Sequence, residues 1–154
     1  MTYGLVLLLS LAACGEKTQP LSVQVFPARL AGDARGPEYA AWDTVQFAGG
    51  TRSKATTYLV APEPLFTEWN ITACKDAASA DSTSIVVARL NAYASRTMQR
   101  FSEDSARLKQ PLALKVGDRW VSFLPLLRPF EDRISLYGFT REEAGQLQRD
   151  IETR

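Results

Sequence analysis

The sequence contains no histidine among its 154 residues. Histidine is the commonest general base near neutral pH and the commonest side-chain ligand of metals. Its absence excludes Ser-His and Cys-His catalytic pairs. Only two cysteines occur, Cys14 and Cys74, and no Gly-Lys-Ser/Thr follows Gly49 and Gly50, so a phosphate-binding loop is also missing. We therefore expect a protein that is not an enzyme, with no catalytic residues, no metal site and no cofactor.

Neither sign of charge predominates in the chain. Its 18 lysines and arginines balance 17 acidic residues, and the basic residues are spread from Lys17 to Arg154. Because no basic face is indicated, nucleic acid is not expected as a partner. Apolar residues make up 45% of the sequence, which is enough for a chain of this length to bury one ordinary core.

Long apolar runs are missing as well, whereas a bilayer core of about 30 Å requires roughly 20 helical residues. The run from Gly4 to Leu11 spans eight residues, which is typical of a secretory signal. It ends in Leu11-Ala12-Ala13-Cys14. This junction resembles a bacterial lipobox, in which the chain is cut before the cysteine and the thiol receives a diacylglycerol. We predict a signal peptide over residues 1–13 and lipid attachment at Cys14; the alternative is a buried N-terminal helix or strand.

The predicted anchor indicates where the protein is found. Residues 14–20 would tether the folded body about 10–15 Å from the lipid. A second acyl chain, palmitate, on the new amino terminus would make the anchoring stable. The compartment is the bacterial cell envelope, with the body facing the periplasm, and Gly15 in place of Asp favours the outer membrane. Cys74 is then the remaining thiol, so no intramolecular disulfide is expected.

Residues 21–55 form an N-terminal segment in which little regular structure is indicated. Leu21 to Phe26 alternates apolar and polar residues, which predicts a half-buried strand that ends at Pro27. From Pro27 to Ala55 the sequence is rich in Gly, Ala and Pro. We expect this stretch to be irregular, with one strand at Thr44 to Ala48.

Residues 56–154 have clearer patterns. Thr57–Val60 is rich in residues that favour strands, and Thr83–Leu90 is apolar enough to lie centrally in a sheet. A helix capped by Asn91 follows, because one stripe of small and apolar residues recurs every three or four positions. The stripe consists of Ala94, Met98, Phe101, Ser105 and Leu108.

The last third predicts a hairpin, a strand and a second helix. Leu112–Val116 and Arg119–Leu124 flank Gly117-Asp118, a pair that favours a type II′ turn. A short strand is expected at Asp132–Leu136. Thr140 and Glu143 have the spacing of a capping box at a helix start, and the face to be buried is Ala144, Leu147 and Ile151. The order of elements predicts an α+β fold, with two helices packed on one face of a mostly antiparallel sheet.

Several segments of residues 56–154 together carry a family resemblance. They are Tyr58–Thr67, Ile71–Cys74, Ser84–Leu90, Leu112–Val116 with Gly117-Asp118, and Gly138–Ala144. In order and spacing they resemble the head of the first periplasmic domain of the SecD and SecDF preprotein-translocase subunits. The resemblance implies a small α+β module outside the cytoplasm that engages an emerging polypeptide. No segment after residue 14 approaches 18 consecutive apolar residues, so a membrane-embedded motor is not expected.

The predicted function is therefore a lipid-anchored module that holds an extended polypeptide by strand addition. The candidate contact surface is an apolar run made of Trp120, Phe123, Leu124, Leu126 and Leu127. The alternative is that these residues belong to the hydrophobic core. Two other functions stay open. One is a structural subunit of an envelope complex, and the other is a hydrolase that works without histidine, for example through Ser53 and Lys54.

The remaining chemically suggestive residues favour structural roles. Cys74 has no evident catalytic partner and reads as a small buried hydrophobe rather than a nucleophile. Three adjacent acidic pairs are better explained as solvated faces than as paired carboxylates, because neighbouring side chains point apart. These pairs are Glu103-Asp104, Glu131-Asp132 and Glu142-Glu143. Arg52-Ser53-Lys54 is read as a solvated loop, with contact to anionic lipid as the alternative.

Overall fold

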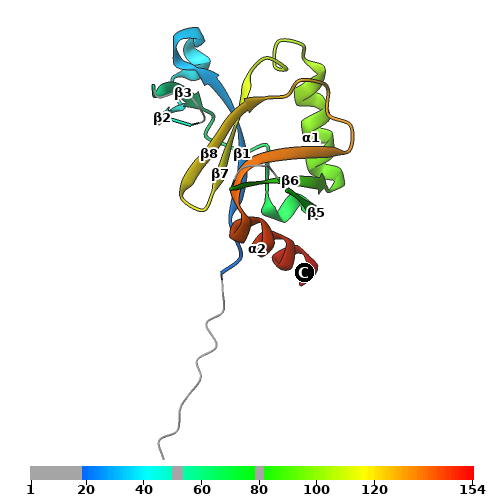
Figure 1. Ribbon diagram of the computed structural model, residues 1–154. Coiled ribbons are helices and arrows are strands. Elements are labelled where there is room, and N and C mark those ends of the chain that lie inside the picture. The colour runs from blue at the N-terminus through cyan, green and yellow to red at the C-terminus, as the bar shows by residue number, and fades with distance from the viewer. Residues whose placement is uncertain (1–18, 50–53, 79–81) are drawn as a thin grey trace, which may run out of the picture.

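A computed structural model describes residues 19–49, 54–78 and 82–154. The predicted signal peptide, Cys14, Arg52 and Ser53 lie outside the described residues. Two antiparallel sheets, of six and three strands, and two α-helices make up the described part (Figure 1). The prediction of an α+β fold with antiparallel pairing and two helices is confirmed, although the strands divide between two sheets rather than one. Within this part, no helix is both long and apolar enough to cross a membrane.

The first sheet has the strand order β2-β3-β1-β7-β8, with β4 added beside β1. Its strands are β1 (Val23–Leu30), β2 (Asp43–Phe47), β3 (Thr56–Val60), β4 (Phe66–Thr67), β7 (Pro111–Val116) and β8 (Arg119–Pro125). The expected hairpin joins β7 to β8. Gly117 has a φ of 58°, and no non-glycine residue among those described, Asp118 included, has a positive φ. A positive φ at the first turn position alone fits the type II′ turn.

The strand β1 continues through Pro27 to Leu30, so the prediction that Pro27 ends the strand is wrong. One edge of β1 pairs with β7 and the ladder stops at Pro27. The other edge pairs with β4 up to Val25 and with β3 from Ala28 onward. Pro27 therefore lies where the strand changes partners, and its missing N–H costs no interior ladder bond.

Residues 27–55 are more regular than expected. The 3₁₀ turns η1 (Ala31–Asp33) and η2 (Pro37–Tyr39) follow β1, and β2 forms close to the predicted strand. Because β1 lies between β3 and β7, the N-terminal segment is built into the middle of the first sheet. A second, smaller cluster, which we call the small aromatic cluster, forms around it. Its buried residues are Phe26, Ala28, Val60, Ala113 and Phe123, and Val45, Phe47, Tyr58 and Trp120 pack against them.

The second sheet has the order β5-β6-β9, with β6 in the predicted central place. Its strands are β5 (Ile71–Ala78), β6 (Thr83–Leu90) and β9 (Arg133–Thr140), and the short turn η3 (Glu68–Asn70) precedes β5. Inward residues such as Val86 and Leu136 join the main core. Both helices contribute to that same core, α1 (Ala92–Glu103) through Met98 and α2 (Arg141–Glu152) through Leu147.

The helix ends show where local patterns hold. Asn91 caps α1 by accepting the N–H of Ala94, and Thr140 caps α2 with the complete capping box, so both predictions are confirmed. The helix α1 ends at Glu103, and Ser105 is exposed beyond it. The predicted stripe is therefore too long at its C-terminal end. The Asp104 carboxylate accepts the N–H of Ala106 at 3.0 Å, and this local turn competes with the helix.

Candidate binding groove

The strands β8 and β9 are edge strands of different sheets, and they contact each other near Val121 and Gly138. The β7–β8 register shifts between Leu114 and Lys115, which leaves Val121 as the extra residue of a β-bulge. The β6–β9 register shifts between Ser84 and Ile85, which leaves Gly138 as the extra residue of a second bulge. Because bulges bend strands and increase their twist, β8 and β9 cross where the two bulges face each other.

The contact between the bulges requires glycine at position 138. Gly138 has a φ of 99°, in the region that other residues rarely adopt. A Cβ built at this position would lie 2.8 Å from the carbonyl oxygen of Val121. Both the backbone conformation and the close approach of the two strands therefore exclude a side chain here.

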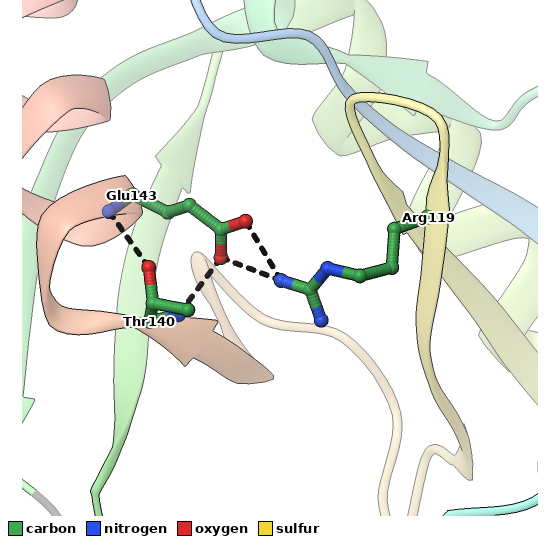
Figure 2. Close-up of polar contacts among 3 residues, drawn as sticks. All are labelled: Arg119, Thr140 and Glu143. Carbon is green, nitrogen blue, oxygen red and sulfur yellow. Dashed lines mark hydrogen bonds and ion pairs between the residues drawn. The ribbon is translucent and has the colours of Figure 1, made fainter.

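An ion pair fixes the two strands on one side of this crossing. The Arg119 Nη2 lies 2.7 and 2.8 Å from the two carboxylate oxygens of Glu143 (Figure 2). The same carboxylate accepts the backbone N–H of Thr140, whose hydroxyl in turn accepts the N–H of Glu143. Arg119 begins β8 and Thr140 ends β9, so the capping box of α2 also ties the hairpin to the second sheet.

On the other side of the crossing the strands separate and leave a cavity of about 530 Å³, which we call the β8–β9 groove. Its lining includes Leu124, Leu127, Ser135 and Tyr137. Leu124 is 46% exposed, Tyr137 43% and Leu127 92%, so large apolar side chains face solvent on both walls. The volume is within the range of binding sites in proteins.

The loop 126–132, which joins the two strands, is held from inside by one buried hydrogen bond. Phe130 is buried in the main core, and its backbone N–H donates to the Ser102 Oγ at 2.8 Å. Ser102 belongs to α1 and donates in turn to the carbonyl of Gln99. This contact positions the wall of the groove, while Leu127 on the same loop remains outside the core.

The rim of the groove carries both signs of charge. Arg128, Glu131, Asp132 and Arg133 all belong to its lining. Asp132 and Arg133 form an exposed ion pair at 3.4 Å. Because the rim contains two acidic and two basic residues, it gives no net preference for a ligand of either charge.

The apolar residues predicted as a contact surface are divided by the structure. Trp120 and Phe123 belong to the small aromatic cluster, and Leu126 packs against the main core. Leu124 and Leu127 line the groove, and Leu126 contributes to the same lining. Sequence reasoning missed Tyr137. Ile134 and Leu136 share the inward face of a strand, so the next residue, Tyr137, lies on the outward face.

The other chemically suggestive residues do not gather at the groove. Burial foremost, followed by the charges of Glu152 and Asp76, raises the pKa of the Cys74 thiol to about 11. A thiol with this pKa stays protonated near neutral pH and is a poor nucleophile. Glu103, like Glu142, is exposed. Among the described residues, no three His, Cys, Asp or Glu side chains are grouped as metal ligands.

No protein-family model and no curated protein sequence matches this chain. The resemblance to the translocase head therefore stays a prediction from the segments named above. The groove itself is bounded by two edge strands, with three large apolar side chains exposed along it and equal numbers of acidic and basic residues at its rim.

Proposed function

We propose that this protein is a lipid-anchored, non-enzymatic module of the bacterial envelope that binds an extended polypeptide in the β8–β9 groove. The observation that carries the proposal is a cavity bounded by the ends of two edge strands and the loop that joins them, with Leu124, Leu127 and Tyr137 exposed along it. An edge strand presents backbone N–H and C=O groups that another extended chain can pair with. The resemblance of residues 56–154 to a translocase head supports the same class of ligand.

The lining indicates which polypeptides the groove would favour. Leu124 on β8 and Tyr137 on β9 provide apolar contacts on the two walls, and Leu127 adds a third from the loop. Side chains alternate along an extended ligand, so apolar residues at every second position would reach these contacts. The mixed charge of the rim favours a segment without strong net charge. Unfolded or partly exported envelope proteins expose segments of this kind.

The binding test measures the affinity of the full chain for a fluorescent peptide with alternating valines and serines. Replacing Leu124 by Ser, or Leu127 by Ser, should weaken binding roughly tenfold, because each substitution removes a leucine that becomes buried in the complex. Leu30→Ser is the matched control, since Leu30 is 40% exposed and lies on β1, outside the groove. Its affinity should equal that of the unchanged protein.

Hydrogen exchange distinguishes strand addition from simple apolar contact. Bound peptide should slow amide exchange in residues 122–125 of β8 or 133–137 of β9, because new ladder bonds protect these groups. Equal losses of affinity in the Leu30 and Leu124 variants would contradict the site. If the peptide binds but amide exchange slows on neither β8 nor β9, strand addition is contradicted.

The anchor is tested separately at the predicted lipid attachment site. Mass spectrometry of the native protein should show a diacylglyceryl adduct on Cys14, and Cys14→Ser should release the protein from the membrane fraction. A Cys14→Ser protein that stays in the membrane fraction would refute the anchor and leave the groove untouched.

A further inference from the structure

The N-terminal end of the described chain leaves the body along α2. The side-chain amide of Gln146 donates to the carbonyl of Gln19 at 3.1 Å, and the N–H of Leu21 donates to the Asp150 carboxylate at 2.8 Å. Figure 1 shows this exit beside α2, at the bottom of the view. The chain thus departs from one defined place on the surface, which we call the exit end.

The turn η3 lies directly at this exit. The buried carboxylate of Glu68 accepts the N–H of Val23 at 2.9 Å. Arg154 donates to the carbonyl of Glu68 at 2.7 Å, and its guanidinium lies 4.3 Å from the centre of the Trp69 ring. The Trp69 side chain is nevertheless 63% exposed. An arginine and a largely exposed tryptophan are therefore held together beside the departing chain.

A second exposed aromatic residue lies at the same end. The N–H of Asn91 donates to the carbonyl of Asn70 at 2.8 Å, which joins the start of α1 to η3. Tyr93 is in the first turn of α1 and is 64% exposed. Tryptophan and tyrosine are the residues enriched at the boundary between lipid and water, because an apolar ring there carries a polar tip.

The distance to the predicted lipid is short. Five residue steps separate Cys14 from Gln19, and a chain of that length spans at most about 18 Å in any conformation. If Cys14 carries the lipid, the exit end must stay close to the headgroups. This step rests on the anchor of the proposed function, whereas the grouping of Trp69, Tyr93 and Arg154 is independent of it.

We infer that Trp69, Tyr93 and Arg154 form a surface that rests on phospholipid headgroups. The two rings lie at the headgroup level, and the guanidinium, which is planar and rich in N–H donors, contacts phosphate oxygens. The anchored body then takes one orientation rather than rotating about its tether. Figure 1 shows the loop between β8 and β9 at the upper right of the view, on the far side of β9 from the exit. The surface therefore turns the β8–β9 groove away from the membrane.

Tryptophan quenching tests this surface with the full-length acylated protein in phosphatidylcholine vesicles that contain lipids brominated on the acyl chains. The chain has three tryptophans. We expect Trp69→Phe to remove more than half of the emission that the brominated lipid quenches. Trp42→Phe is the matched control, because Trp42 follows η2, and Figure 1 shows the blue-to-cyan segment after β1 that contains η2 at the top of the view, away from the exit. This variant should keep the quenchable emission.

A second variant keeps Trp69 in place and does not depend on its replacement. Tyr93→Asp puts a carboxylate on the same surface, where headgroup phosphates repel it, and should lower the quenching of Trp69 at least twofold. Circular dichroism checks that both variants keep their fold, which is expected because both rings are mostly exposed.

Vesicle flotation separates the two possible failures. If Cys14→Ser floats as the acylated protein does, the anchor is wrong. If flotation requires Cys14 but Trp69→Phe and Trp42→Phe are quenched alike, or Tyr93→Asp changes nothing, the anchor stands and the headgroup surface is overturned.

Discussion

The exit end and the groove end differ in how their backbone N–H and C=O groups are hydrogen bonded. At the exit end, side chains from distant parts of the sequence satisfy the first backbone N–H groups, with Asp150 binding Leu21 and Glu68 binding Val23. At the groove end, β8 and β9 are edge strands with apolar side chains beside them. The difference teaches that the fold satisfies the backbone at the exit end with its own side chains, whereas each edge strand at the groove end has a ladder partner on one side within its sheet.

The largest expected effect concerns Cys74, which lies on β5, the strand that α2 packs against. Its pKa of about 11, against an ordinary value of 9, lowers the thiolate fraction at pH 8 about 100-fold. Iodoacetamide should therefore react about 100-fold more slowly with folded Cys14→Ser protein than with a thiol of ordinary pKa. Ala77→Cys in a Cys14→Ser, Cys74→Ala background provides that exposed reference on the same strand.

The same raised pKa sets the sign of a pH dependence. Between about pH 9 and 11 the folded protein keeps the Cys74 proton that the unfolded chain releases, so stability should fall as the pH rises through this window. Cys74→Ala should remove that component of the fall. Equal alkylation rates for Cys74 and the exposed reference would show that β5 does not bury the thiol.

At the groove end, Gly138→Val should have the next largest effect. The substitution forces a β-branched residue to a φ of 99° and puts its Cβ against the Val121 carbonyl. We expect a loss of at least about 2 kcal/mol in the free energy of unfolding, measured by urea denaturation. Gly32→Ala, where a Cβ meets nothing within 4 Å, should change it little. A tolerated valine would mean that the bulges do not define the crossing.

Glu68→Ala tests whether side-chain contacts stabilise the exit end. The substitution leaves the N–H of Val23 without its carboxylate partner in a buried place. The expected cost is about 1–3 kcal/mol in the free energy of unfolding, and the amide of Val23 should exchange faster. Glu63→Ala removes an exposed carboxylate from the preceding loop and serves as the control. Similar effects of the two substitutions would erase the contrast between the ends.

Arg119→Ala should have the smallest effect, because Arg119 is half exposed and its ion pair with Glu143 is screened by water. We expect a loss of about 0.2–1 kcal/mol that shrinks in 1 M salt. Arg96→Ala, an exposed position on α1, controls for the loss of one positive charge. A salt-independent loss would assign the role of Arg119 to packing rather than to charge.

Local signals explain which features the sequence could predict. The Gly117-Asp118 turn and the caps at Asn91 and Thr140 depend on neighbouring residues alone, and all three occur as predicted. The passage of β1 through Pro27 depends instead on a change of partner strands, and one of these strands, β7, is distant in the sequence, as the pairing of Pro27 with Leu112 shows. Such long-range pairing is not encoded in local alternation.

The groove was only partly predictable for the same reason. Leu124 and Leu127 were expected among contact residues, but the same apolar run contains the buried Phe123. Composition cannot separate them, because burial depends on which sheet each residue faces. The role of Gly138 as a bulge facing Val121 requires the register of two sheets at once, so it became visible only with the fold.

The central place of β1 has a consequence for how the protein is made. Val23, near the start of the folded body, pairs with Val116, and Leu21 bonds to Asp150 in the last helix. One edge of β1 can pair with β3 and β4 once residue 67 has been synthesised, but its other edge has no partner until β7 exists. Contacts so distant along the chain slow folding. The nascent protein should therefore complete its first sheet only after β7 and β8, in the C-terminal third of the chain, have been synthesised.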